Sequence, residues 1–283
     1  MLTGAESGHI KNFKFKYRTK MKSIKMDALR LLWIILTGAI PGFLATWLGI
    51  GGCFLRIPMM MALLGLPIKT AYAVNMAVIS LTTIPGVIAH YRSRHVYSKG
   101  VLIASIAAAV GVLLGTQLAI WTPSSMLKKI FGIACVGVGI YMLYGAAKGK
   151  GKIPPRVTID EVKRLEAGSK LFALMFFAGI ATGLCGFGGG IYYMPILNAL
   201  GYPMHIAVGT SSAEMIFVAG VGAANLTIHG YIDVISFIGI GAVNLLLSWR
   251  GAKAAKTTKA WILKMAFGVL IGIIGGLVAL GFI

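Results

Sequence analysis

Gly49-Ile-Gly-Gly-Cys-Phe-Leu-Arg-Ile-Pro58 is the stretch that decides the fold, because the chain repeats it as Gly186-Phe-Gly-Gly-Gly-Ile-Tyr-Tyr-Met-Pro195. The second copy begins 137 positions after the first (186 − 49 = 137), and each copy ends in proline. After one deletion, further glycines repeat at a separation of 136: Gly65 and Gly201, Gly86 and Gly222, Gly115 and Gly251, Gly132 and Gly268. Self-similarity of this length indicates two copies of one structural unit, each interrupted by a glycine cluster.

The sequence around both copies is dominated by apolar side chains. Of the 283 residues, 58% are hydrophobic and 12% are charged, and the mean hydropathy is +0.86, whereas soluble domains carry about 25% charged residues. Apolar runs of about 20 residues, the length of a helix that crosses the hydrocarbon core, follow one another along the chain. Short alternating segments typical of a β-barrel do not occur. The sequence therefore predicts an all-α polytopic membrane protein, located in the cell membrane.

Each repeat is predicted to contain five helical elements. The second element of each is a half-crossing of about a dozen residues, which lies between the glycine cluster and a Gly-x-Pro corner. Irregular backbone at membrane depth needs cover from protein or a wet cavity, so we expect both breaks to face inward. The expected ranges are 28–49, 53–65, 70–91, 100–121 and 126–147, then 170–186, 190–201, 205–229, 232–249 and 260–283. The chain then divides into a basic tail (1–27), membrane repeat 1 (28–147), a polar linker (148–169) and membrane repeat 2 (170–283).

The net charge of +20 is concentrated in the N-terminal tail and in the connections between apolar runs. This distribution is typical of topology-setting residues near anionic lipid headgroups, so we expect a lipid bilayer as a partner and no nucleic acid. The connection 92–99 is basic and its counterpart around Gly230 is not, whereas 250–264 is strongly basic and its counterpart 116–129 holds two lysines. This opposite bias predicts inverted topology for the two repeats, with the basic connections in the cytoplasm.

The two glycine clusters are the first candidate site. Gly51 and Gly52 in the first copy, and Gly188, Gly189 and Gly190 in the second, permit tight turns with no side chain in the way. A helix interrupted there exposes N-terminal N–H groups that attract anions. Close packing of helices through small residues is the alternative. Because the cluster is duplicated beside a half-length element, we expect it to line a substrate site.

Polar side chains within the apolar runs are further candidates. Arg56 either grips an oxyanion with its guanidinium or extends to the membrane interface. Asn75 aligns with Ser211 (211 − 136 = 75), and Thr210 and Ser212 flank the latter. Both repeats thus place hydrogen-bonding groups at the same depth, which indicates either a shared central site or ordinary hydrogen bonds between helices.

Glu214 is the one of seven acidic residues that lies inside an apolar run. A buried carboxyl group takes up and releases protons at accessible pH, so proton coupling is one interpretation, and a structural partner for arginine or backbone N–H groups is the other. The histidines and the three cysteines, Cys53, Cys135 and Cys185, have no metal-ligand spacing. We expect no metal and no cofactor.

At these residues the chain resembles the sulfite exporter TauE/SafE family of membrane permeases. The resemblance rests on Gly49-x-Gly-Gly…Pro58, on Gly186-x-Gly-Gly-Gly…Pro195 and on Ala207-Val-Gly-Thr-Ser211, and it extends from about Leu29 to Ile283. It implies transport of sulfite, a sulfonate or another small organic anion without ATP hydrolysis. The first copy departs from the second at Cys53, which replaces a third glycine, and at Val74-Asn75, which replace Thr210-Ser211.

We therefore expect a secondary transporter, and not an enzyme, that carries a small sulfur-containing or organic anion with proton coupling. The anion would lie between the two breaks, and rocking of one repeat against the other would alternate access. A passive anion channel and an intramembrane enzyme are the alternatives. The identity of the anion, import or export, the coupling ion and a homo-oligomeric assembly are left open by the sequence.

Overall fold

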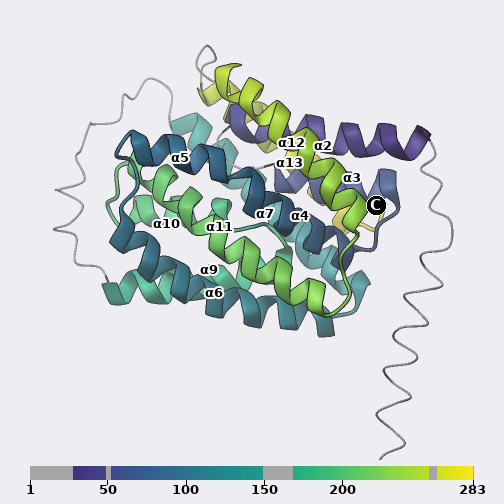
Figure 1. Cartoon of the computed structure of the whole chain (residues 1–283), viewed down its shortest axis with the longest axis horizontal. Helices are drawn as coiled ribbons and strands as arrows, with labels where there is room; N and C mark the ends of the chain where they lie inside the picture. The colour runs from purple at the N-terminus through teal and green to yellow at the C-terminus, as the bar shows by residue number, and fades with distance from the viewer. Residues whose placement is uncertain (1–27, 49–51, 149–167, 255–259, 283) are drawn as a thin grey trace, which may run out of the picture. The chain divides into compact units, whose positions relative to one another are not determined.

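The computed structural model describes residues 28–48, 52–148, 168–254 and 260–282, and the regular structure within these ranges is helical (Figure 1). The first half contains α2 (Ala28–Leu48), α3 (Cys53–Leu64), α4 (Ile68–Thr82), α5 (Ile84–Arg92), α6 (Ser98–Trp121) and α7 (Ser124–Lys148). The second contains α9 (Gly168–Cys185), α10 (Gly190–Ala199), α11 (Met204–Ile228), α12 (Val234–Ala254) and α13 (Ala260–Ala279). The chain divides within α2 into two units, Met1–Trp33 and Ile34–Ile283, and the packing below is that of the second unit.

Large apolar side chains cover the outside of the helices. Within the described residues, five spans are long and apolar enough to cross a membrane: Ile68–Arg92, Ser98–Trp121, Ser124–Gly145, Gly168–Cys185 and His205–Ile228. Outward residues such as Leu102 and Phe177 expose more than half of their surface. Exposed apolar surface of this extent is unfavourable in water and is solvated in hydrocarbon. The chain is an all-α polytopic membrane protein, as its composition predicts.

The predicted element 70–91 is in fact two helices, α4 and α5, which meet at Thr83. Pro85 lies in the first turn of α5, where it has no N–H to donate and its ring excludes the carbonyl one turn earlier. The hydroxyl groups of Thr82 and Thr83 donate to the carbonyl oxygens of Val78 (2.7 Å) and Ile79 (2.6 Å). Each side-chain bond adds a donor to a carbonyl oxygen in the last turns of α4, and that of Ile79 also accepts the N–H of Thr83 at 3.1 Å.

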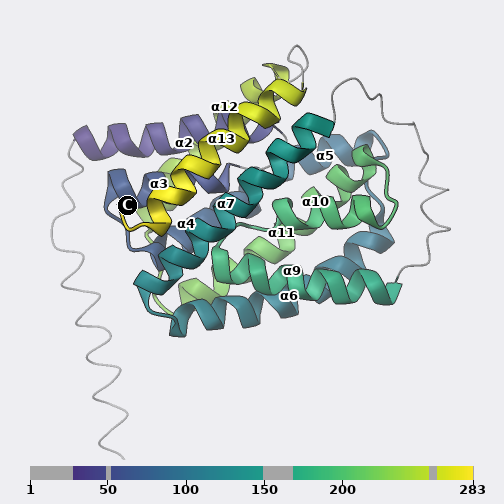
Figure 2. The ribbon, with the colours of Figure 1, turned by 180° about the vertical axis from the view of Figure 1, so that it is seen from behind.

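The last helices of the two halves, α7 and α13, pack side by side and antiparallel (Figure 2). Their contact runs through glycines: Gly132 faces Gly275, and Gly139 faces Gly268. A Cβ atom on Gly132 would lie 2.6 Å from the carbonyl oxygen of Gly275, so only glycine permits this approach. Adding 136 to one member of the first pair and subtracting 136 from the other gives the second pair. Contacts in which equivalent residues exchange places in this way are expected when two halves are related by a two-fold axis.

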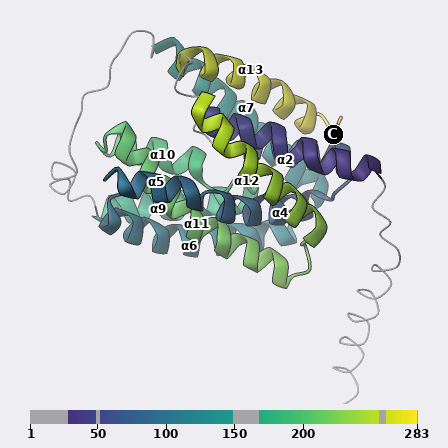
Figure 3. The same cartoon turned by 45° about the horizontal axis from the view of Figure 1, so that its top comes forward.

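The same exchange is seen at a second pair of interfaces, where α6 packs on α9 and their equivalents in the other halves, α12 and α2, pack on each other. On the α6–α9 interface (Figure 1), a Cβ atom on Gly179 would lie 2.8 Å from Cα of Ala108. On the interface of α12 with α2 (Figure 3), a Cβ atom on Gly42 would lie 3.1 Å from Cα of Asn244. The two glycines are 137 positions apart and their partners 136. Inverted orientation of the repeats in the membrane stays a prediction, which the antiparallel packing of the equivalent helices α7 and α13 supports.

The centre of the second unit is formed by α4 and α11. They pack against each other, and the Ser80 hydroxyl of α4 donates to the carbonyl oxygen of Ile216 on α11 at 2.9 Å. These two residues are 136 positions apart, so they lie where the two halves meet. α11 is also the most buried of the five spans. The two short helices, α3 and α10, pack on α4 and α11 respectively, which brings Gly52 and the second glycine cluster to this centre.

Candidate functional site

The second glycine cluster forms a turn that glycine alone adopts readily. Gly186, Gly188 and Gly189 have φ angles of +69°, +69° and +95°, in the left-handed region that a Cβ atom disfavours. Gly189 precedes α10, and its carbonyl oxygen accepts the N–H of Tyr193 at 3.0 Å. A Cβ atom on Gly189 would overlap the Tyr193 ring. The turn thus starts a helix whose first N–H groups, from Gly190 onward, have no acceptor within the helix.

The first glycine cluster is described from Gly52 onward, and Gly51 lies outside the described residues. Gly52 is buried and precedes α3, and its carbonyl oxygen accepts the N–H of Arg56 at 3.0 Å. A Cβ atom on Gly52 would overlap the carbonyl oxygen of Pro41 on α2. The absence of a side chain at Gly52 therefore permits close contact between α2 and the start of α3.

Two hydrogen bonds connect the two halves at these breaks. Arg56 donates from Nη1 to Oδ1 of Asn75 at 2.9 Å, and Asn75 donates from Nδ2 to the carbonyl oxygen of Gly186 at 2.7 Å. Arg56 is 1% exposed and Asn75 is fully buried. Because the amide of Asn75 uses its acceptor on one side and its donor on the other, its orientation is fixed. The guanidinium of Arg56 is thereby held beside the turn that begins at Gly186.

The positive charge of Arg56 is buried beside a neutral partner. Its described hydrogen bond is to an amide, and its Nε has no hydrogen-bond partner among the described residues. A buried charge without a counter-charge is unfavourable, so the site gains free energy when an anion enters. The planar guanidinium is suited to binding two oxygens of one oxyanion.

Aromatic side chains enclose the second turn. The ring of Phe187 packs against Phe54 of α3 (centroids 4.8 Å apart), Phe131 of α7 (5.1 Å) and Tyr192 of α10 (6.0 Å). Tyr72 of α4 adds to this aromatic cluster through Phe131 at 6.0 Å. These contacts exclude water from the surroundings of Gly186, which strengthens electrostatic interactions there. The cluster has no signal in the sequence, because its members come from different helices.

The hydroxyl groups of Thr210, Ser211 and Ser212 on α11, which were predicted to line the site, make hydrogen bonds to backbone groups and not to Arg56 or Asn75. Thr210 accepts the backbone N–H of Tyr97 at 3.1 Å, and Ser211 and Ser212 donate to the carbonyl oxygen of Val208 at 3.1 and 2.7 Å. These bonds attach α11 to the connection before α6 and to its own backbone. Asn75 is the residue of the predicted set that contacts Arg56. Contact of the three hydroxyl groups with a substrate stays a prediction.

Glu214 of α11 is fully buried, and neither carboxyl oxygen has a hydrogen-bond partner among the described residues. Tyr193 of α10 interacts electrostatically with Glu214 and lies beside Thr182 of α9. The Tyr193 and Thr182 hydroxyl groups are close enough to interact with each other, but neither makes a hydrogen bond of normal geometry in the described part of the chain. Sequence reasoning did not single out Tyr193 or Thr182, although Tyr193 occupies the position of Arg56 in the second repeat (193 − 56 = 137).

Three histidines from both halves meet near the connection between α5 and α6. The ring of His95 lies 6.1 Å from that of His90 and 4.9 Å from that of His205, centroid to centroid. Burial and the neighbouring His205 lower the pKa of His95 below its ordinary value of 6.5. Among the described residues, no three histidine, cysteine or acidic side chains are grouped as metal ligands.

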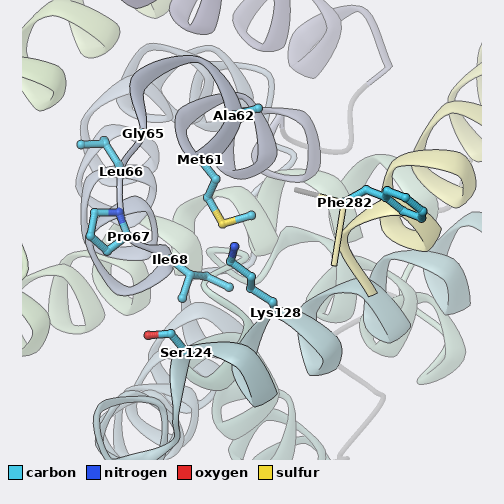
Figure 4. A pocket seen from close by; sticks show the side chains of 9 residues that line it. All are labelled: Met61, Ala62, Gly65, Leu66, Pro67, Ile68, Ser124, Lys128 and Phe282. Carbon is cyan, nitrogen blue, oxygen red and sulfur yellow. The ribbon is translucent and has the colours of Figure 1, made fainter. Parts of the chain in front are cut away.

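A pocket of about 530 Å³ opens at the corner between α3 and α4 (Figure 4). Its walls are largely apolar, and Figure 4 shows the Lys128 ammonium directed toward Met61 and Ile68. The residues that line it are Met61, Ala62, Gly65, Leu66, Pro67, Ile68, Ser124, Lys128 and Phe282. The pocket thus offers one cation and none of the predicted site residues.

The chain is similar to known membrane proteins over most of its length. The family model described as sulfite exporter TauE/SafE matches residues 34–278. The chain is 28% identical to a probable membrane transporter protein of Methanocaldococcus jannaschii, over 87% of this chain and 94% of that protein. It is 24% identical to a probable membrane transporter protein of Bacillus subtilis, over 84% and 94%. A probable membrane transporter protein of Xylella fastidiosa strain 9a5c is 27% identical over 65% and 72%. No solved structure matches the chain.

Proposed function

Since the chain belongs to the sulfite exporter TauE/SafE family of membrane transporters, we propose that it is a secondary transporter of a small anion, such as sulfite or a sulfonate. The cell membrane is its proposed location. The observation that carries the proposal is the buried guanidinium of Arg56, whose described partner is the neutral amide of Asn75. A permanent cation at the centre of a membrane protein selects for negatively charged ligands.

The proposed binding site lies between the two breaks. Arg56 provides a positive charge and N–H groups that can donate in a bidentate manner, and Asn75 keeps the guanidinium beside the Gly186 turn. The first N–H groups of α10 add partial positive charge at Gly190. Sulfite and sulfonate groups carry three oxygens on one sulfur, so a single anion has enough acceptors for both the guanidinium and the helix end.

Alternating access would follow from movement of one repeat against the other. The Asn75–Gly186 bond joins the repeats and would break or reform in each cycle, because its two ends belong to different halves. Coupling to protons through Glu214 is the second part of the proposal. It distinguishes a secondary transporter from a passive channel, which cannot accumulate an anion against its gradient. Catalysis is not part of the proposed function.

The test is uptake of labelled sulfite and of a labelled sulfonate by proteoliposomes that contain the purified protein. We expect saturable uptake by the wild-type chain and at least a tenfold loss of apparent affinity for Arg56→Gln, since a charged hydrogen bond to the anion is removed. Arg56→Lys keeps the charge but loses the bidentate donor geometry, so its apparent affinity should lie between those of the wild type and Arg56→Gln. Absence of flux for every small anion tested, with monodisperse protein, would exclude this function.

A further inference from the structure

The carboxyl group of Glu214 has no neighbouring group in the described structure that would stabilise its ionised form. It is fully buried, and both of its oxygens lack a hydrogen-bond partner among the described residues. An ionised carboxylate in such surroundings is strongly unfavourable. In the conformation described here, the group therefore needs a bound proton or a bound cation.

Two further polar groups extend from Glu214: Tyr193 lies next to it, and Thr182 lies next to Tyr193. The Tyr193 side chain interacts electrostatically with the carboxyl group and lies beside Thr182, and both residues are fully buried. The two hydroxyl groups lie close enough to interact with each other, but neither makes a hydrogen bond of normal geometry within the described chain. Polar side chains from α9, α10 and α11 thus follow one another through Tyr193, and none of their four side-chain oxygen atoms makes a hydrogen bond of normal geometry. Native proteins rarely leave such groups unpaired unless the site has a function.

The surrounding charges do not neutralise Glu214. Arg56 is bonded to Asn75. On the helices packed against α11, the other titratable side chains within the described residues interact elsewhere or lie at helix ends. Lys69 bonds the carbonyl oxygen of Ile120, and Tyr72 and Tyr192 interact with buried thiols. On α5, His90 interacts with His95, Tyr91 is exposed and Arg92 ends the helix, and Lys99 lies in the first turn of α6. Among the described side chains, Tyr193 remains as the titratable neighbour of Glu214.

The repeat alignment relates this cluster to the proposed anion site. Tyr193 occupies the position of Arg56, at a separation of 137. Glu214 occupies the position of Val78, at a separation of 136, and Thr182 that of Ala45, at 137. The first repeat therefore has a cation and no carboxyl group at these positions, and the second has a carboxyl group and no cation.

We propose that Glu214, Tyr193 and Thr182 form the coupling-proton site, and that it is the diverged duplicate of the anion site at Arg56. The proposal rests on the proposed anion transport and adds the positioning residues of the coupling step. Glu214 binds the proton, and the two hydroxyl groups hydrogen-bond the carboxyl group when movement of α10 against α11 closes the cluster. A proton needs only the carboxyl group itself, whereas hard divalent cations take six or more oxygen ligands, more than this cluster provides.

The test uses proteoliposomes of the full chain and 2-hydroxyethanesulfonate, whose charge does not change over the pH range used. Two assays are compared. Exchange of labelled for unlabelled anion at equal pH measures the anion site alone, and accumulation driven by an imposed pH gradient measures coupling. The variants are Glu214→Gln, Tyr193→Phe and Thr182→Val, and Tyr192→Phe is the matched control from the adjacent position of α10.

Glu214→Gln should keep exchange within about threefold of wild type and lose accumulation above the equilibrium ratio. Tyr193→Phe and Thr182→Val should each move the pH midpoint of driven transport upward by about one unit, since each removes one donor to the carboxylate. Tyr192→Phe should leave the midpoint in place. The proposal is overturned by gradient-driven accumulation in Glu214→Gln, by unmoved midpoints in both hydroxyl variants, or by wild-type accumulation that follows a sodium gradient instead. Absence of exchange in the wild type would instead remove the proposed function, and this inference with it.

Discussion

Asn75 donates a hydrogen bond of 2.7 Å to the carbonyl oxygen of Gly186, which lies 111 positions away in the other half of the chain. The same amide accepts from Arg56 at 2.9 Å. One side chain thus orients the buried cation and contacts the turn before α10. The site and the contact between the two halves are therefore parts of the same hydrogen-bonded structure.

Asn75→Ala should weaken anion binding about tenfold, because Arg56 loses the partner that fixes its orientation. The apparent KM for sulfite or sulfonate in proteoliposomes is the measurement. Asn225→Ala is the matched control, since Asn225 donates to Thr116 at 2.7 Å between α11 and α6 and has no contact with Arg56. It should lower thermal stability and leave KM unchanged. Equal KM values for the two variants would show that Asn75 has only a structural role.

Gly189→Ala should destabilise the protein by about 1–3 kcal/mol, because φ of +95° disfavours a Cβ atom and that atom would overlap the Tyr193 ring. The melting temperature of the purified protein in detergent measures this. Gly276→Ala is the control: no heavy atom lies within 4 Å of the position that its Cβ atom would take on α13, and alanine favours helix by about 1 kcal/mol. A melting temperature of Gly189→Ala at or above that of the control would contradict the described turn.

Inverted repeats place Arg94 and Gly230 on opposite sides of the membrane. Single cysteines at these positions, in a background without the buried free thiols of Cys53, Cys135 and Cys185, should react with an impermeant maleimide from opposite faces of sealed vesicles. The expected cytoplasmic side is that of Arg94, by the positive-inside rule. Labelling of both positions from the same face would exclude inverted topology.

Acidification should loosen the connection between α5 and α6. The pKa of His95 is lowered by burial and by His205, so the folded state favours the neutral ring, and this stabilisation is present at high pH and lost as pH falls through about 6.5. The Tyr97 amide, which donates to Thr210, should lose hydrogen-exchange protection below that pH after correction for the intrinsic rate. His95→Gln should abolish the change. Protection that is independent of pH in the wild type would contradict this interpretation.

The duplicated motif predicted much of the fold, because glycine clusters and apolar run lengths are local properties of the sequence. It placed both short helices, α3 and α10, and the second break within two residues, whereas residues 49–51 of the first break lie outside the described residues. The division of α4 from α5 was missed, although Pro85-Gly86 signals it. An apolar run that continues on both sides obscured this signal.

The site could be predicted only in part, because its contacts join residues that are distant in the sequence. Arg56 and Asn75 stand out as polar residues in apolar runs, but their bond joins positions 19 apart and the next bond joins positions 111 apart. Such contacts depend on how helices pack. Tyr193 was accessible to sequence reasoning through its alignment with Arg56, whereas the ring contacts of Phe187 were not, since no spacing rule connects residues on different helices.

The most direct test of the central claim is a structure of the protein determined by cryo-electron microscopy with and without a saturating sulfonate. The account predicts difference density for the anion within hydrogen-bond distance of the Arg56 guanidinium, between Asn75 and the start of α10. Density confined to the pocket beside Lys128, with none at Arg56, would contradict it.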